Sequence, residues 1–386
     1  MEKQKICIIG GSLAGLVTAI SLSKLNCDID LITDNSKNIY KSNRTVAISK
    51  NNLRYLNKLD ISKHLNKEVW PCSMMKLYSN HKGKKFTEIF DINNTKDNKI
   101  LYMIENSKII KMMTDKIKKI NSISVKKNKK IDEIYSSGLL KSIKLNNKNV
   151  KYNLVIICAG SDSALIKKIF RDKNIVNSYN EVSITTIINH NACKNNIARQ
   201  IFLDDEILAL LPISKTKTSI VWSVKKNKQN QNVSLVKNKI KFYAREFLEN
   251  VIFLKKIEYR NLNLLIRNKY YKNRILLFGD ALHQVHPFVG QGFNMILRDL
   301  AFLEKIFYRK LSLGLDIGSV DILDEFSSKI KPSNFAFSIG VDLLKNSFSI
   351  KNKYFKDIRD ESLKVLNKNE FAKNIFINIA DKGLKF

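Results

Sequence analysis

The chain has 386 residues, of which 44 % are hydrophobic, and it carries a formal net charge of +33. This apolar content supports a sizeable core and excludes global disorder, and the length allows two domains or one large interleaved one. The positive charge is spread over the whole sequence without a single basic block, so no nucleic-acid partner is predicted, whereas attraction to an anionic membrane is favoured. The five cysteines are far apart, which is typical of reduced thiols in a cytoplasmic protein.

The N-terminal segment imitates a signal peptide, because a basic start precedes a run of uncharged residues. The run contains three glycines and two serines, is short for a membrane span, and is followed by no evident cleavage site. The hydrophobic pattern instead predicts a strand at Lys5–Ile9, a helix at Leu13–Leu25 and a second strand at Ile29–Ile32. No other segment approaches transmembrane length, so any membrane contact is expected to be peripheral, on the inner membrane face.

The turn of this βαβ unit reads Gly10-Gly11-Ser12-Leu13-Ala14-Gly15, which fits G-x-G-x-x-G with Ser12 at the middle glycine. Gly10 permits a tight turn, Gly15 permits close packing of helix on strand, and the helix N-terminus faces a pyrophosphate. The pattern predicts a dinucleotide site, and an ordinary βα turn is the alternative. A carboxylate for the ribose is expected about 20 residues further on; Asp34 is preferred, with Thr33 as the alternative.

The rest of the chain alternates between two kinds of pattern. Residues 73–91 predict a hairpin around His81 to Gly83, residues 181–224 predict successive antiparallel strands, and Asn153–Phe170 predicts a strand, a glycine turn and a helix. Beyond residue 300 the pattern is helical. The order predicts an α/β fold: a Rossmann-like dinucleotide-binding domain interleaved with an antiparallel-sheet substrate domain, followed by a helical C-terminal region. The expected boundaries are 1–70, 101–175 and 266–320 for the first domain, 71–100 and 176–265 for the second, and 321–386 for the C-terminal helices.

The stretch Gly279–Leu300 contains three of the 13 glycines. A buried strand, Arg274–Asp280, places the Asp280 carboxylate in the crevice at the end of the sheet, where it can accept hydrogen bonds from sugar-like hydroxyls. A helix then begins near Gly290-Gln291-Gly292, whose bare amides form an anion site. The N1 and C2 carbonyl end of a reduced flavin is such an anion, and Pro287 would stiffen the loop along the ring.

The polar residues of this stretch give weaker signals. His283 and His286 lie three apart in a loop with no third ligand indicated, so no metal site is predicted. One of them is expected as a polar contact near the flavin, or as a residue that stabilises the loop. No acid/base pair is evident and the catalytic residues stay unknown, with His283 the only candidate. Arg298 and Asp299 are expected as a pair at the helix surface or between domains.

The segments "GGSLAG", "NRTVAIS" and "LLFGDALHQVHPFVGQGFNMILRDL" resemble the FAD-dependent aromatic hydroxylases of ubiquinone biosynthesis, which are para-hydroxybenzoate-hydroxylase-like flavin monooxygenases. The resemblance spans almost the whole chain and implies FAD as the cofactor. It implies that the glycine-rich turn holds the ADP half, that Arg44 supports the cofactor, and that Asp280 bonds the ribityl chain. The cofactor-binding residues so expected are Gly10, Gly11, Ser12, Gly15, Asp34, Arg44, Gly279, Asp280, Pro287, Gly290, Gln291, Gly292 and Asn294.

The resemblance also implies an activity: hydroxylation of the aromatic ring of a polyprenylated phenol by O₂, through a flavin C4a-hydroperoxide. An external donor, NADPH or a redox protein, would supply the electrons, and a ubiquinone-biosynthesis complex is an expected partner. The chain departs from the family's Asp-Gly-x-x-Ser-x-x-Arg motif, with Ala159 and Ile166 at the charged positions, which argues against NADPH as the direct donor. The alternatives are an isoprenoid reductase, a hydroxylase of a soluble aromatic, or a redox-degenerate basic binding protein.

Overall fold

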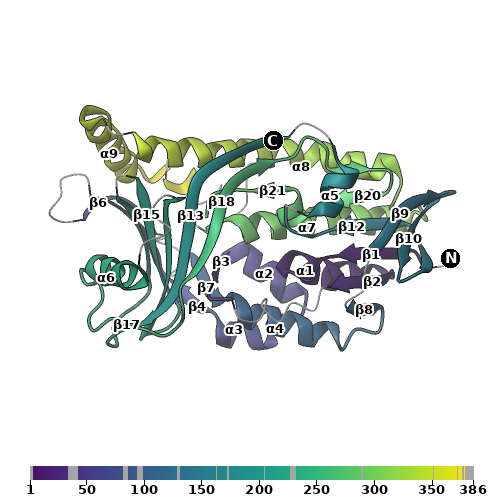
Figure 1. Ribbon diagram of the computed structural model, residues 1–386, viewed down its shortest axis with the longest axis horizontal. Coiled ribbons are helices and arrows are strands. Elements are labelled where there is room, and N and C mark those ends of the chain that lie inside the picture. Colours follow the sequence, from purple (N-terminus) through teal and green to yellow (C-terminus); the bar gives the residue numbers. More distant parts are fainter. Residues whose placement is uncertain are drawn as a thin grey trace.

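The computed structural model shows an elongated molecule with one β-sheet toward each end and long helices running between them (Figure 1). The residues described are 3–33, 42–80, 86–93, 99–127, 131–161, 163–171, 174–203, 205–226, 232–287, 290–350, 352–371, 373–375 and 378.

A six-stranded sheet occupies one half, in the order β19-β20-β12-β1-β2-β8. Every neighbouring pair is parallel except β19 with β20. The strands are β1 (Lys5–Ile9), β2 (Asp28–Thr33), β8 (Ile123–Lys127), β12 (Leu154–Ile157), β19 (Tyr271–Lys272) and β20 (Ile275–Leu277). The Ile and Val side chains of β1 and β12 are buried, as expected for the central strands of a covered parallel sheet. This sheet confirms the predicted Rossmann-like half.

A larger sheet occupies the other half, in the order β21-β18-β13-β16-β15-β14-β5-β6, with β17 (Ile252–Phe253) paired to β13. Its neighbours are antiparallel except β14 with β5. The strands are β5 (Met74–Ser79), β6 (Thr87–Asn93), β13 (Ile175–Asn189), β14 (Ile197–Leu203), β15 (Glu206–Pro212), β16 (Lys217–Lys225), β18 (Glu258–Ile266) and β21 (His283–Gln284). The predicted hairpin is confirmed by β5 and β6, although its expected turn at His81 to Gly83 lies outside the described residues.

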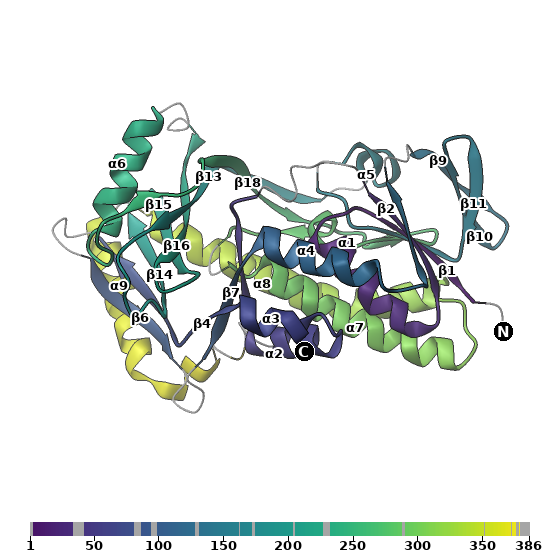
Figure 2. The same cartoon turned by 90° about the horizontal axis from the view of Figure 1, so that it is seen from below.

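Two smaller sheets complete the β-structure. The order β3-β7-β4 joins β3 (Thr45–Ser49), β7 (Leu101–Glu105) and β4 (Trp70–Cys72). The order β11-β10-β9 joins β9 (Ile131–Ser137), β10 (Leu140–Leu145) and β11 (Lys148–Tyr152), and this sheet lies at the end of the molecule that holds the N-terminus (Figure 2). The chain passes repeatedly between the two large sheets, which confirms the interleaved order; the boundaries of the six predicted segments stay a prediction.

The helices are α1 (Leu13–Leu22), α2 (Lys50–Lys58), α3 (Ser62–Glu68), α4 (Asn106–Ile117), α5 (Ala164–Ile169), α6 (Val233–Ala244), α7 (Gly292–Ser312), α8 (Val320–Ser349) and α9 (Lys353–Lys368). Helix α8 runs from the parallel-sheet half toward the antiparallel sheet (Figure 1). Among the helices within the described ranges, none is long and apolar enough to cross a bilayer.

Candidate active site

The glycine-rich turn after β1 accepts no side chain at two of its positions. Gly10 has a φ of +126°, and a Cβ there would lie 2.8 Å from the carbonyl carbon of Cys158, which follows β12. A Cβ on Gly15 would lie 1.8 Å from the Gly10 oxygen. Ser12 is the N-cap of α1, and its hydroxyl donates to the Cys158 carbonyl at 3.4 Å. The turn therefore holds α1 close to two strand ends, with bare amides at the helix start.

The carboxyl ends of β20, β12 and β1 lie side by side, because these strands are parallel neighbours. Gly279 lies two residues after the end of β20 and has a φ of +66°. A Cβ on it would lie 2.6 Å from the Ala14 Cβ. This close contact packs the Gly279–Ala281 turn against α1. Asp280 in the same turn is exposed. The sheet thus brings the first turn and Asp280, 270 residues apart in the sequence, to one edge.

Arg44 lies just before β3 and joins this edge. Its side chain is open to solvent, yet protein surrounds it enough that desolvation, followed by the nearby Arg260, lowers its pKa; Asp280 and Glu258 oppose that shift. The delocalised guanidinium of an arginine remains a cation in proteins. Two guanidinium groups and two carboxylates therefore meet here, which suits a ligand that carries both phosphates and hydroxyls.

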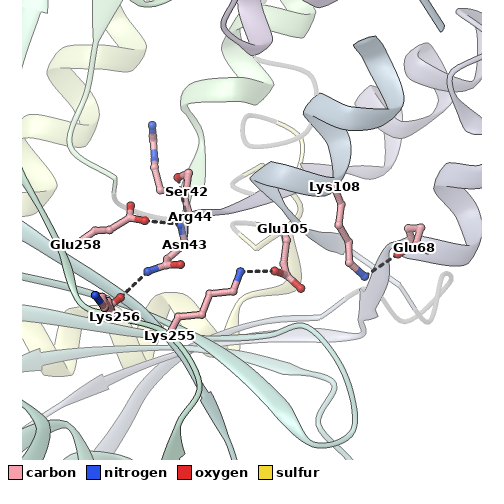
Figure 3. Close-up of polar contacts among 9 residues, drawn as sticks. All are labelled: Ser42, Asn43, Arg44, Glu68, Glu105, Lys108, Lys255, Lys256 and Glu258. Carbon is pink, nitrogen blue, oxygen red and sulfur yellow. Dashed lines mark hydrogen bonds and ion pairs between the residues drawn. The ribbon is translucent and has the colours of Figure 1, made fainter. Parts of the chain in front are cut away.

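Polar contacts fix the segment that carries Arg44 (Figure 3). The Asn43 amide donates to Glu258 at 2.8 Å and its side chain donates to the Lys256 carbonyl. Nearby, Lys255 pairs with Glu105 at 2.9 Å. These bonds tie β3 and β7 to the loop and first residues of β18, so the position of Arg44 depends on the antiparallel sheet.

The N-terminus of α7 combines tight and open backbone. Gly290 has a φ of +64°, and a Cβ on it would lie 3.0 Å from the Ala47 Cβ, whereas a Cβ on Gly292 would meet no atom within 4 Å. The Gly290 amide donates to the Pro287 carbonyl at 3.3 Å, which closes the turn. Gln291 is buried, and neither polar atom of its side-chain amide has a hydrogen-bond partner among the described residues.

Asn294 holds α7 in place. Its side chain is fully buried; Oδ1 accepts from the Ser49 amide at 3.0 Å and from Asn52 at 2.9 Å, and Nδ2 donates to the Ala47 carbonyl at 2.9 Å. Because both polar atoms of the side chain are bound to β3 and α2, this side chain attaches α7, and the cofactor contact expected of Asn294 stays a prediction.

The two histidines lie in the interior. His283 is buried, with Nε2 3.1 Å from Asp299, which also accepts from Asn334 at 2.8 Å. This triad fixes β21 between α7 and α8, so His283 is not retained as an acid or base. The expectation of a surface role for Asp299 was wrong, because α7 turns that residue inward. Among the described residues, no group of three His, Cys, Asp or Glu side chains could hold a metal ion.

Arg267 was missed by sequence reasoning. It is buried just beyond β18, and its guanidinium donates to the Ala281 carbonyl at 2.7 Å and to the Ser161 carbonyl at 3.3 Å. It thereby joins the loops that follow β20 and β12. Ile166, at the position of the family's arginine, is fully buried in the core. The sequence offered only one indication, an isolated arginine at the end of an apolar strand.

These features fit FAD. The glycines at which a Cβ would collide form a close backbone approach, two helices begin at the same edge, and the unpartnered Gln291 amide offers both a donor and acceptors. Asp34, the expected ribose ligand, lies outside the described residues; Thr33, the alternative, ends β2, beside Gly11.

Comparison with known proteins supports this conclusion. A relative in Dictyostelium discoideum, the mitochondrial ubiquinone biosynthesis monooxygenase COQ6, is 24 % identical across 99 % of this chain and 92 % of its own length. The ubiquinone hydroxylase UbiM of Neisseria meningitidis is 20 % identical across 84 % of this chain and 73 % of its own.

Solved structures share the fold. The p-nitrophenol 4-monooxygenase PnpA of Pseudomonas putida superposes with a TM-score of 0.81 at 14 % identity, over 100 % of both chains. Klebsiella pneumoniae HpxO, solved with FAD and uric acid, superposes with a TM-score of 0.79 at 14 % identity, over 98 % of this chain and 97 % of its own. A family model described as an FAD binding domain matches residues 3–334. The chain therefore belongs to this FAD-binding family and is an FAD-dependent monooxygenase.

Proposed function

We propose that this monooxygenase hydroxylates the aromatic ring of a polyprenylated phenol in ubiquinone biosynthesis. The observation that carries the proposal is the match of nearly the whole chain to a ubiquinone biosynthesis monooxygenase, with both large sheets included in the matched length. Membership in the monooxygenase family argues against an isoprenoid reductase and against a redox-degenerate binding protein.

We further propose how the cofactor lies. The amides of Gly11 and Ser12 face the ADP half at the start of α1, with Gly15 beneath them, while Gly10 forms the turn and its own amide donates to the Ile32 carbonyl at 2.9 Å. Asp280, next to Gly279, accepts from the ribityl hydroxyls, while Arg44 neutralises phosphate charge. Pro287 and the start of α7, with the Gln291 amide, lie along the ring, and Asp34 or Thr33 binds the ribose. Two observations support this placement. A Cβ added to Gly10, Gly15 or Gly279 would collide with neighbouring atoms, and the Asp280 carboxylate interacts electrostatically with Arg44.

When bound, FAD supplies the redox chemistry with O₂ and an external donor. The protein's part is to orient and to exclude water. The α7 N-terminus stabilises negative charge at the ring by its unpaired amides. The antiparallel sheet forms the surface against which the aromatic ring of the substrate is held. The bonds from Asn43 to Glu258 and Lys256 fix the position of Arg44 relative to that sheet.

The test is chemical analysis of the quinone pool in cells that lack the gene. The expected result is accumulation of a polyprenylated ring that lacks one hydroxyl. The parent gene should restore the normal quinone pool, and a Gly10→Ala variant that still folds should not. An unchanged quinone pool in the cells that lack the gene would refute the proposed substrate. If a soluble aromatic compound accumulates instead, the substrate is wrong while the flavin chemistry stands.

We also propose that α9 brings the protein to its insoluble substrate at a membrane surface, either alone or within a biosynthetic complex. Tyr354, Ile358 and Val365 are exposed at helical spacing, between lysines, whereas Phe337 and Phe348 of α8 are buried. Lysines near an anionic surface each contribute about 1 kcal/mol, and salt weakens the attraction. The protein should co-sediment with anionic liposomes at low salt and be released as salt rises; equal recovery with neutral liposomes would leave delivery by a partner protein.

A further inference from the structure

A buried ionic cluster lies beside the loop that leads into α7. His286 Nε2 lies 3.2 Å from one oxygen of Glu181, and Lys345 Nζ lies 2.6 Å from the other. All three side chains are buried. They come from β13, from the residue before Pro287 and from α8, so one carboxylate joins the antiparallel sheet, the loop and the C-terminal helix.

The strand is shaped for this contact. The pairing of β13 with β18 shifts register between Ser178 and Glu181, and Asn180 in the resulting bulge has a φ of +52°. The Tyr179 ring lies edge-on to the His286 ring at 5.4 Å, and Lys345 Nζ lies 4.7 Å from the Tyr179 ring centroid. Bulges re-aim side chains near functional sites, and this one sets two residues against the loop.

The side chains of Glu181, His286 and Lys345 together carry no net charge when His286 is neutral, and the Asp342 carboxylate of α8 lies near them. Burial lowers the pKa of His286, with Lys345 acting in the same direction, while Glu181 and Asp342 of α8 oppose the shift. Burial raises the pKa of Glu181, but the bonds from His286 and Lys345 outweigh it, so that pKa is lowered. Because a carboxylate only accepts, Nε2 of His286 carries the proton; Nδ1 is buried and has no hydrogen-bond partner within the described ranges.

We propose that Glu181, His286 and Lys345 are positioning residues, a buried lock that holds Pro287 and the start of α7 at one distance from the antiparallel sheet. The proposal rests on the placement of the flavin ring along that loop. Burial disfavours a second proton on the cluster, and the positive charge of Lys345 adds to this, whereas Glu181 and Asp342 compensate the added charge only in part. The lock is therefore stable above the ordinary pKa of histidine, about 6.5, and is lost as pH falls through the lowered folded value.

The experiment follows the visible circular dichroism of bound FAD between pH 5 and pH 8.5. The parent should give one spectrum at neutral pH and a change in acid. Lys345→Met removes the cation that lowers both pKa values, so the transition should move up by about one pH unit. His286→Gln keeps a donor toward Glu181 and cannot titrate, so it should keep the neutral spectrum and lose the acid transition. Lys108→Met, which breaks an exposed pair with Glu68, should behave as the parent.

Gln291→Ala separates the two levels of the proposal. If Gln291→Ala leaves the flavin spectrum unchanged, the ring does not lie along the loop and the proposed placement fails. If Gln291→Ala changes the spectrum while folded Lys345→Met titrates like the parent, the lock alone is overturned. If Lys345→Met does not fold, the double variant Glu181→Gln with Lys345→Met removes both charges and should fold. In that case the test is the comparison of the parent with His286→Gln. An identical acid transition in these two proteins would refute the lock.

Discussion

Replacement of Asp280 by alanine tests the placement of the cofactor most directly. Asp280 is exposed, so its removal leaves no cavity and unmakes no core contact. Its loss removes hydrogen bonds from hydroxyls to a charged acceptor, worth about 1.5–3 kcal/mol. Arg44 and Arg260 remain nearby, and without the carboxylate they attract the cofactor's phosphates more strongly, which offsets part of the loss. We therefore expect FAD to bind about 1–2 kcal/mol more weakly, which is roughly a 5–30-fold increase in Kd.

The assay is titration of the apoprotein with FAD, followed by flavin fluorescence, with thermal unfolding as a check on folding. Asp280→Asn, which keeps one acceptor oxygen, should fall between the parent and Asp280→Ala. Asp115→Ala is the matched control, because that carboxylate forms an exposed pair with Lys118 on α4. A Kd for Asp280→Ala within twofold of the parent would show that the carboxylate does not contact the cofactor.

Three further outcomes are expected. Gly10→Ala should abolish FAD retention through gel filtration, because of the collision with the backbone of Cys158, whereas Gly160→Ala, where a Cβ meets nothing within 4 Å, should retain it. Asn294→Ala should lower the free energy of unfolding by about 2–4 kcal/mol in urea titrations, since it strands buried groups of β3 and α2; a loss below 0.5 kcal/mol would contradict the attachment role. With apolar Ala159 and Ile166 in place of the family's charges, NADPH alone should reduce the flavin slowly in anaerobic stopped-flow mixing, and rapid bleaching would refute this.

Sequence reasoning reached the parts of the fold that depend on local pattern. The turn at Gly10 and the strand before Asp280 carry their own signals, because backbone collisions there demand glycine and parallel strands demand continuous apolar runs. The inward direction of Asp299 and the role of Asn294 could not be predicted, since each depends on which helix face meets which strand. Arg267 and the Glu181 cluster were missed for a related reason: their partners lie far away in the chain, and a single charged residue has no period.

The alternation of the chain between the two large sheets has a consequence for how the protein is made. β1 pairs with β12 across nearly 150 residues, from Ile6 to Leu154, and β12 pairs with β20 only at Ile275. During synthesis the first glycine turn emerges early, but Asp280 and the start of α7 emerge after more than two thirds of the chain. A nascent chain that ends before residue 275 contains Gly10 and Arg44 but still lacks Asp280 and the start of α7. If Asp280 and the start of α7 bind FAD as proposed, cofactor capture is a late event of biosynthesis. Loops that close over such long separations make folding slow.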